Sequence, residues 1–292
     1  MGRYPLESIM LKPVVFPAPH PTARYGKLSS DRGDLLFLTL FHKNEPDAIG
    51  QAFLIGYDRT TMSLAIFDLD NTLIADDSDY LWGQFLVDQG VVDKNEYEAA
   101  NAKFYQQYKQ GCLDITEFLS FSLRPLAAHP TATLLQWREQ FVSEIITPIL
   151  LQPAQQLIDQ HKARGDTLMV ITATNRFVTE PIVKHYGIDT LLATTPEFIA
   201  GRYTGCYVGV PCFQEGKVTQ LQDWLQQSGE SLQGSCFYSD SHNDLPLLKC
   251  VDYPVAVDPD DKLRHYAEQA NWPIISLRGS QCPNVSNLQP AG

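Results

Sequence analysis

Short apolar segments alternate with amphipathic segments through the second half of the 292-residue chain, and this alternation restricts the fold more than any other feature. From Pro153 onward, apolar residues recur at helical spacing, and Gly165 and Gly187 stand where two helices should end. Helices alternating with short strands predict an α/β fold, a Rossmann-like parallel sheet with helices on both faces. Strands are expected at 64–68, 167–172, 191–194, 236–239, 254–257 and 273–277, helices at 154–164, 177–186, 217–227, 244–250 and 262–271, and a hairpin at 198–207.

The segment between the first two expected strands, residues 79–149, shows helical patterns only. The boundary signals are Gly111 after a helix at 94–110, Asp114 with Glu117 as a capping box, Thr131 or Thr133 as a further cap, and Pro148 as a stop. We therefore expect a helical cap that is inserted into the sheet domain after its first strand.

Residues 1–61 differ from the rest of the chain. They contain several prolines and dispersed basic residues, and they sustain neither a helical nor a strand period. We expect a poorly structured N-terminal extension, and our hypothesis is that the functional protein begins near Met62, after a mis-called start. The alternative is a genuine N-terminal subdomain. The expected organisation is the extension at 1–61, a core domain at 62–78 and 150–280, the helical cap at 79–149 and a C-terminal tail at 281–292.

The charge and the cysteine pattern argue against several classes of function. The net charge is −12 and the pI is about 4.9, whereas a protein that binds nucleic acid needs a basic face. The apolar run Leu35–Phe41 is far shorter than the roughly 20 residues that span a bilayer. The six cysteines form no C-x-x-C pair, so we expect reduced thiols in a cytoplasmic protein without a membrane partner. The oligomeric state cannot be read from the sequence.

Polar residues follow the first expected strand directly. The segment Asp68-Leu69-Asp70-Asn71-Thr72 places two carboxylates two residues apart, immediately after four apolar residues. Like charges this close raise each other's pKa unless a cation lies between them. The pattern therefore indicates a cation-dependent site. The alternative is a purely structural loop, because Asp and Asn are common where strands turn into loops.

Three later segments add polar side chains at strand ends or helix starts. Thr172 closes the second expected strand, where it also fits the cap of the following helix. Lys217 opens a helix, where a cation is unfavourable, and the alternative is a solvated surface charge. Asp240 ends another strand, and Asp244 follows four residues later. Because ligands bind at the carboxyl ends of parallel strands, these side chains should converge with the first carboxylate pair.

The order of these four segments resembles the haloacid-dehalogenase superfamily, whose motifs are Asp-x-Asp-x-Thr, Ser or Thr, Lys, and an acidic pair. The resemblance spans residues 62–277 and implies a phosphatase with an aspartyl-phosphate intermediate. The implied catalytic residues are the nucleophile Asp68, the general acid and base Asp70, the phosphoryl hydrogen-bond donor Thr172 and the neutralising Lys217. The implied cofactor is Mg²⁺, bound by Asp68, the main-chain carbonyl of Asp70, Asp240, and Asp244 directly or through water. The metal would explain how an acidic protein binds a phosphate dianion.

The position of the cap refines the resemblance. A helical C1 cap between the first two motifs is similar to the phosphoserine-phosphatase-like branch and implies a small phosphorylated metabolite as substrate. Finer segments at 67–73, 77–83, 171–179, 210–218, 238–248 and 272–277 resemble the haloacid-dehalogenase-type histidinol-phosphatases of bacteria. This resemblance implies L-histidinol phosphate as the substrate and histidine biosynthesis as the role. The expected substrate-binding residues are Asp77, Trp82, Thr174, Asn175 and Asn243.

The charges near the start of the cap fit the same substrate. Histidinol phosphate has an ammonium and an imidazole but no carboxylate, so Asp76, Asp77 and Asp79 would suit it, with Tyr80 and Trp82 for ring contact. The alternatives are a solvated hinge for the acids and cap packing for the two rings. Phosphoserine phosphatase, for which Arg124 would meet the substrate carboxylate, and a broad-specificity phosphatase remain open, as does a phosphotransferase. The complete set of motif residues disfavours a dehalogenase or a non-catalytic protein.

Overall fold

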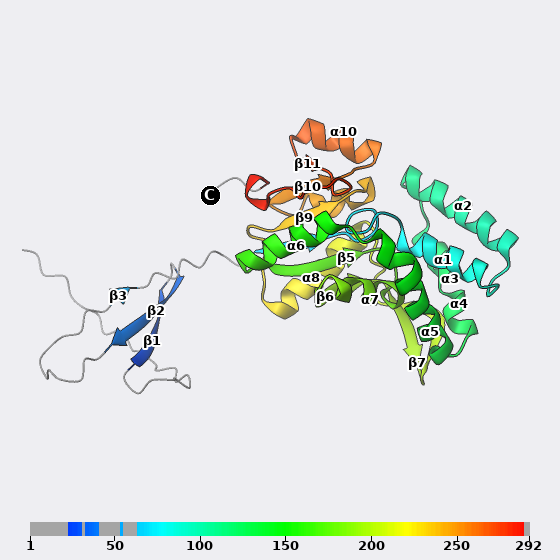
Figure 1. Cartoon of the computed structure of the whole chain (residues 1–292), viewed down its shortest axis with the longest axis horizontal. Coiled ribbons are helices and arrows are strands. Elements are labelled where there is room, and N and C mark those ends of the chain that lie inside the picture. Colours follow the sequence, from blue (N-terminus) through cyan, green and yellow to red (C-terminus); the bar gives the residue numbers. More distant parts are fainter. Residues whose placement is uncertain (1–22, 31–32, 41–52, 55–62, 289–292) are drawn as a thin grey trace, which may run out of the picture. The chain divides into compact units, whose positions relative to one another are not determined.

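A computed structural model describes residues 23–30, 33–40, 53–54 and 63–288, and the chain divides into two units, Met1–Thr61 and Met62–Gly292 (Figure 1). In the first unit, β1 (Ala23–Ser30) pairs antiparallel with β2 (Gly33–Leu40), which pairs antiparallel with β3 (Phe53–Leu54). The sequence showed no strand period here, and these three strands are the part of the expected poorly structured extension that the structure describes. The rest of that extension lies outside the described residues.

The second unit is built on a six-stranded sheet in the order β11-β10-β9-β4-β5-β6, in which every pair is parallel. The strands are β4 (Leu64–Phe67), β5 (Thr167–Thr172), β6 (Thr190–Ala193), β9 (Cys236–Ser239), β10 (Tyr253–Val257) and β11 (Ile274–Ile275). The predicted α/β fold is confirmed. Because β4 lies between β5 and β9, the carboxyl ends of these three strands are neighbours.

Helices cover both faces of this sheet, as predicted. Alternate residues of β4 join different hydrophobic clusters: Leu64 and Ile66 pack on one face, and Ala65 and Phe67 on the other. The helices of the core are α6 (Gln152–Arg164), α7 (Arg176–His185), α8 (Glu215–Ser228), α9 (Leu245–Leu248) and α10 (Asp261–Ala270), with 3-10 turns η3 (His242–Asp244) and η4 (Val285–Asn287). The helix that was expected at 244–250 is shorter, because η3 precedes it.

The insertion after β4 consists of helices only and lies beside the sheet (Figure 1). Its elements are α1 (Ser78–Asp88), α2 (Lys94–Gln110), α3 (Ile115–Ser122), α4 (Arg124–Ala128), α5 (Thr131–Phe141), the π-helical turn η1 (Val142–Ile146) and the 3-10 turn η2 (Thr147–Ile149). The side chains of α1 and α5, with Leu119 of α3 and Leu126 of α4, belong to the same hydrophobic cluster as α6 and α7. The buried rings of α2 form a small separate cluster with Phe121 of α3. The cap is therefore joined to the hydrophobic core through all of its α-helices except α2.

The helix boundaries of the cap follow the sequence signals in part. Asp114 accepts hydrogen bonds from the amides of Thr116 and Glu117, so the Asp114 half of the predicted capping box is present, while the carboxylate of Glu117 pairs with Lys103. Thr131 does not cap α5, because the preceding Pro130 takes the N-cap position and the Thr131 hydroxyl donates to the carbonyl of Gly201. The α-helical part of that segment also ends before the predicted stop at Pro148, since η1 and η2 follow it.

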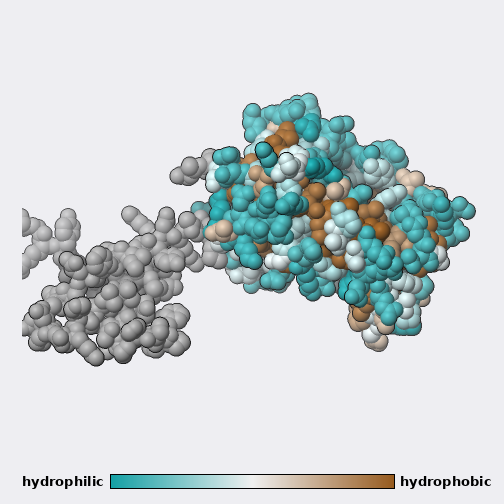
Figure 2. Space-filling view, in the orientation of Figure 1, coloured by the Kyte–Doolittle hydropathy of each residue, from teal (hydrophilic) through white to brown (hydrophobic). Residues whose placement is uncertain are grey.

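The predicted hairpin is formed by β7 (Thr195–Ile199) and β8 (Arg202–Val208), and it turns at Ala200 and Gly201. Within the described ranges, no helix is both long and apolar enough to cross a membrane. Figure 2 shows a mostly hydrophilic face on the second unit, with hydrophobic side chains gathered near its middle.

Candidate active site

The carboxyl ends of the three central strands bring the predicted polar residues together. Asp68 directly follows β4, and its amide donates to the carbonyl of Tyr238 in β9 at 2.9 Å, which extends the sheet pairing up to the carboxylate. Thr172 ends β5, and Asp240 follows β9. Asp68 and Thr172 are buried. Parallel pairing thus places side chains from distant parts of the sequence at one edge of the sheet.

Lys217 is the cation at the centre of this group. Its Nζ lies 2.8 Å from Oδ1 of Asp68 and 2.7 Å from Oδ1 of Asp244, and only 4% of its side chain is exposed. Burial alone would lower the pKa of Lys217, but the two carboxylates outweigh it and raise the pKa. Lys217 is therefore a buried charge with two partners, and the alternative of a solvated surface lysine is excluded.

The backbone at the start of α8 places Lys217 at the ends of the strands. Gln214 has a positive φ of 48°, which is uncommon for a residue with a side chain. At Gly216, a Cβ atom would lie 1.9 Å from the carbonyl oxygen of Pro211, so only glycine fits there. The local sequence is thus constrained by the close approach that brings the lysine to the strand ends.

Asp244 and Asp240 occupy different positions around the nucleophile. The carboxylate of Asp244 accepts from Lys217 and from the hydroxyl of Ser239 at 2.7 Å, so it holds the lysine in place. The hydroxyl of Thr72 lies 3.5 Å from Oδ2 of Asp68 and 3.4 Å from Oδ1 of Asp240, and it accepts the amide of Asp240 at 3.1 Å. Asp68 and Asp240 therefore face each other across this one hydroxyl.

The two facing carboxylates are only partly neutralised by the protein. Burial raises the pKa of Asp68 to about 7, while Lys217 opposes the rise and Asp244 and Asp70 add to it. Burial and the charge of Asp68 raise the pKa of Asp240 well above its usual range. A divalent cation between the two carboxylates would compensate their mutual repulsion and stabilise their ionised forms.

The donor set fits magnesium. Within the part of the chain that the structure describes, no three Asp, Glu, His or Cys side chains gather closely enough to hold a metal ion by themselves. Mg²⁺ does not need such a cage, because it is commonly bound by one or two carboxylates together with water and substrate phosphate oxygens. Asp68 and Asp240 could supply the carboxylates, with the carbonyl of Asp70 as the predicted main-chain ligand.

The carboxylate of Asp70 has different neighbours from that of Asp68. Its Oδ1 accepts the amide of Ser78 at 2.7 Å, and its Oδ2 accepts the hydroxyls of Thr174 at 2.8 Å and Thr172 at 3.3 Å. Burial raises the pKa of Asp70, although these donors oppose the rise. A raised pKa suits a carboxyl group that must donate a proton near neutral pH.

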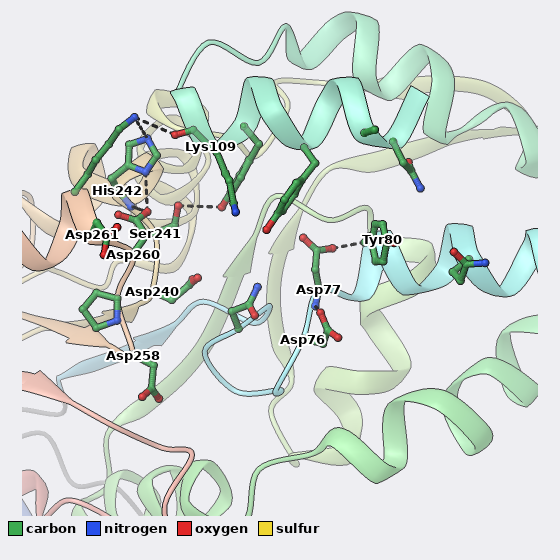
Figure 3. Close-up of a pocket in the computed structure, with 18 of the residues that line it drawn as sticks. Asp76, Asp77, Tyr80, Lys109, Asp240, Ser241, His242, Asp258, Asp260 and Asp261 are labelled. Carbon is green, nitrogen blue, oxygen red and sulfur yellow. Dashed lines mark hydrogen bonds and ion pairs between the residues drawn. The ribbon is translucent and has the colours of Figure 1, made fainter. Parts of the chain in front are cut away.

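Cavities open between the core and the cap. A cavity of about 1020 Å³ reaches Asp240 and is lined by several acids together with Lys109, His242, Lys262 and Arg278, and Figure 3 labels a number of these residues around it. An adjoining smaller cavity, the acid–aromatic pocket, has a volume of about 90 Å³. Its walls are Asp77, Asp79, Tyr80, Asn101, Phe104, Tyr105, Tyr108, Leu113, Ile115, Phe118, Ala173, Thr174 and Phe213. Two carboxylates line this pocket, and no Lys, Arg or His is among these wall residues.

The predicted substrate-binding residues have different surroundings. Asp77 and Thr174 line the acid–aromatic pocket. Asn175 caps α7 and donates to Asp79 at 3.5 Å. Trp82 is 2% exposed, packs against aromatic rings and lines neither of the two cavities. The amide of Asn243 accepts from Gln214 and donates to the carbonyl of Tyr108 and to Ser241.

Sequence reasoning missed the aromatic walls of the pocket. Tyr108, Phe104 and Phe118 come from α2 and α3, and Phe213 comes from the loop before α8. Tyr108 also donates to the hydroxyl of Ser241, beside Asp240, at 2.9 Å. The only signal in the sequence was the helical spacing of apolar residues in α2, which does not distinguish a ring in a pocket from one in the cap interior.

Comparisons with known proteins agree with this geometry. The pattern of haloacid dehalogenase-like hydrolases matches residues 65–249. A histidinol-phosphatase of Neisseria meningitidis serogroup C (strain 8013) is 46% identical over 220 residues, which cover 74% of this chain and 99% of the relative. A phosphoserine phosphatase of Mycobacterium tuberculosis (strain ATCC 25618 / H37Rv) is 29% identical over 217 residues, covering 73% and 70%.

Solved structures show the same fold. A protein of unknown function from Bordetella pertussis Tohama I is 42% identical, with a TM-score of 0.71 over 75% of this chain and 100% of that one. A phospho-aspartyl intermediate analogue of phosphoserine phosphatase has a TM-score of 0.56 at 18% identity, covering 74% and 93%. The fold and the relatives define a phosphatase. The chain belongs to the haloacid dehalogenase-like hydrolase family, as the sequence motifs predicted.

Proposed function

We propose that this phosphatase hydrolyses L-histidinol phosphate to L-histidinol and phosphate, as a Mg²⁺-dependent cytoplasmic enzyme of histidine biosynthesis. The observation that carries the proposal is the acid–aromatic pocket beside Asp70, which combines the carboxylates of Asp77 and Asp79 with aromatic walls. An ammonium group and an imidazole ring match these two features. The relative from Neisseria, which bears the name histidinol-phosphatase, supports the same substrate.

The first chemical step is attack of the Asp68 carboxylate on phosphorus, with cleavage of the bond to the alkoxide oxygen. Lys217 lies against Asp68, orients it and neutralises the phosphoryl charge. The hydroxyl of Thr172, which donates to Asp70 at 3.3 Å, would turn to donate to a phosphoryl oxygen of the substrate. Asp70 gives its proton to the leaving alkoxide. In the second step Asp70 accepts a proton from water, which attacks the aspartyl-phosphate and releases phosphate.

Asp68, Asp240 and the carbonyl of Asp70 would hold the metal. When bound, Mg²⁺ would supply positive charge to the phosphoryl oxygens and compensate the two facing carboxylates. Asp244 acts mainly through Lys217, which it contacts at 2.7 Å, and it would reach the metal only through water. This assignment keeps each predicted metal residue, with Asp70 acting through its main-chain carbonyl and Asp244 through water.

The pocket disfavours phosphoserine, the main alternative substrate. Phosphoserine has a carboxylate, which needs a cation, and no Lys, Arg or His is among the wall residues of the acid–aromatic pocket. The basic side chains Lys109, His242, Lys262 and Arg278 line the larger adjoining cavity instead. Arg124 does not serve this purpose, because its guanidinium pairs with Glu96 at 2.9 Å and lines a separate cavity of the cap. In this pocket a substrate carboxylate would meet two acids and no cation.

The test is phosphate release with Mg²⁺ from L-histidinol phosphate, phosphoserine and p-nitrophenyl phosphate. We expect kcat/KM for histidinol phosphate to exceed that for phosphoserine by ~100-fold or more, about 2.7 kcal/mol of discrimination. Asp79→Asn should lower kcat/KM for histidinol phosphate ~10- to 100-fold and change that for p-nitrophenyl phosphate by less than about 3-fold. Asp88→Asn, an exposed acid on the same helix, is the matched control. Similar rates on all three substrates would refute the substrate assignment and leave the phosphatase chemistry in place.

A further inference from the structure

The loop that follows the nucleophile, residues 70–78, determines where the carboxylate of Asp70 points. Asn71 has a positive φ of 56°, and its amide donates to the carbonyl of Asp76 at 3.1 Å, so the chain turns back on itself. The loop ends at Ser78, whose amide donates to Oδ1 of Asp70 at 2.7 Å. The general acid is therefore held by the far end of its own loop.

Arg278, which also lines the cavity of about 1020 Å³, contacts this loop at two points. Its Nη1 donates to the carbonyl of Ala75 at 2.7 Å, and its Nη2 donates to the carbonyl and to the side-chain oxygen of Asn71, both at 3.3 Å. A guanidinium suits this task because its planar fork can satisfy several acceptors at once, whereas a lysine ammonium is a point charge on a flexible stem. Arg278 lies beyond residues 65–249, so the family pattern does not include it.

The core fixes the position from which Arg278 reaches the loop. The preceding Leu277 is fully buried, and its amide donates to Asp258 at 2.9 Å. The carboxylate of Asp258 also lies 3.9 Å from Nε of Arg278. This distance and the partial exposure of the arginine make the ion pair weak. The three hydrogen bonds to the loop are thus the principal contacts of the guanidinium.

We propose that Arg278 is a positioning residue that keeps the loop 70–78 closed and thereby orients Asp70 as the general acid. The inference rests on the proposed function, because it needs Asp70 to protonate the leaving group. An alkoxide leaves poorly without a proton, whereas p-nitrophenolate leaves readily without one. Loss of Arg278 should therefore affect an alkyl phosphate far more than an aryl phosphate.

The experiment compares Arg278→Ala and Arg278→Lys with the unmodified protein. For Arg278→Ala we expect kcat/KM on L-histidinol phosphate to fall ~10- to 30-fold and kcat/KM on p-nitrophenyl phosphate to change less than about 3-fold, because kcat/KM reports the departure of the leaving group, whereas hydrolysis of the aspartyl-phosphate is common to both substrates. Arg278→Lys should recover part of the loss, since it can still bond one carbonyl. Arg264→Ala, an exposed arginine of α10, is the control and should leave both rates unchanged.

Hydrogen exchange provides a readout that does not depend on activity. Arg278→Ala should speed amide exchange in peptides covering 70–78 by ~10-fold or more and leave the strands unaffected. Equal losses of kcat/KM on both substrates, or unchanged kcat/KM and exchange, would overturn the proposal. If the unmodified protein released no phosphate from either substrate, the proposed function would fail, and unchanged exchange would separately refute the role of Arg278 in the loop.

Discussion

Two parts of the active site, the strand ends (the floor) and the helical cap (the roof), are held by different kinds of contact. The floor consists of strand ends, where Lys217 is buried between Asp68 and Asp244 at 2.7–2.8 Å. The roof is the helical cap, and the end of α2 meets the core through polar contacts near the surface. Nζ of Lys262 donates to the carbonyls of Lys109 and Gln110 at 3.0 and 3.1 Å, and the lysine is exposed. Buried ion pairs hold the catalytic side chains in place, whereas more accessible hydrogen bonds hold α2, the helix that lines the substrate pocket.

The helices of the cap also differ in how firmly they pack against the core. Trp82 of α1 and Phe141 of α5 pack with Phe177 of the core in the main hydrophobic cluster. Tyr97 and Phe104 of α2 belong to a small separate cluster. Segments with few buried apolar contacts open at lower free energy than segments in the core. We therefore expect α2 to be the part of the roof that opens for substrate, whereas α3 is anchored by Leu119 in the main cluster.

The largest effect should come from the nucleophile on the floor. Asp68→Asn should lower kcat by at least about 10⁴-fold, because an amide cannot form the aspartyl-phosphate. The melting temperature should stay the same or rise, since the change removes a buried carboxylate while Lys217 keeps Asp244 as a partner. Asp223→Asn, an exposed acid on α8, is the control. A variant with normal turnover would end the mechanism.

A smaller but still large effect should follow from removing the cation of the floor. Lys217→Met leaves two buried carboxylates without their partner and should cost about 3–5 kcal/mol of unfolding free energy in the absence of metal. It should also lower kcat by ~10³-fold, because the pKa of Asp68 rises further and the phosphoryl charge is less neutralised. Chemical denaturation measures the first quantity, with exposed Lys162→Met as the control. Adding Asp244→Asn should restore part of the stability, and failure to do so would contradict the charge argument.

The floor and the roof also differ in how far the sequence predicted them. The floor was predictable because Asp68, Thr172 and Asp240 each follow an apolar strand, and parallel pairing brings strand ends together. Lys217 could be assigned through the family motif, while the strained backbone of Gln214 that aims it inward had no signal in the sequence.

The helices of the roof could be predicted from the sequence, but the side chains that face the substrate pocket could not. Helical spacing shows which positions face an interior, but it does not show whether that interior is the cap core or the pocket. Trp82 was expected at the substrate and lies in the hydrophobic cluster, whereas Tyr108 was overlooked and lines the pocket. The contacts of Arg278 depend on the path of the chain after β11, which a local pattern cannot contain.

The third prediction concerns pH and uses acids from both regions. Burial raises the pKa of Asp68 to about 7, of Asp77 to about 8 and of Asp79 to about 7, against roughly 3.9 in an unfolded chain. The unfolded chain therefore releases these protons at lower pH than the folded protein. Their contribution to stability is fully present below pH ~4 and is lost as pH rises through 7 to 8. In EDTA, the melting temperature should fall on the order of 5 °C between pH 5 and 8.

Two changes distinguish the contributions of the floor and the roof to the pH dependence of the melting temperature. Adding Mg²⁺ should reduce the part of the decline that comes from Asp68, and Asp77→Asn should reduce the part from the roof without any metal. Asp166 and Asp260 do not contribute to the change between pH 5 and 8. Their partners lower their pKa values, so both are ionised in the folded and the unfolded protein above pH 5. A melting temperature that rises from pH 5 to 8 in EDTA would contradict the prediction.

The smallest effect should come from the contact that holds α2 to the core. Lys262 lies at the amino end of α10, where a cation is unfavourable for its own helix, and it contacts the carboxyl end of α2, where a cation is favourable. Lys262→Ala should therefore leave the melting temperature nearly unchanged and raise KM for the substrate about 3-fold. Hydrogen exchange should increase in peptides covering 105–112, with Lys184→Ala as the control. If KM and exchange both stayed constant, the end of α2 would be held by Tyr108 and Asn243 alone, and the contrast between floor and roof would rest on the aromatic cluster instead.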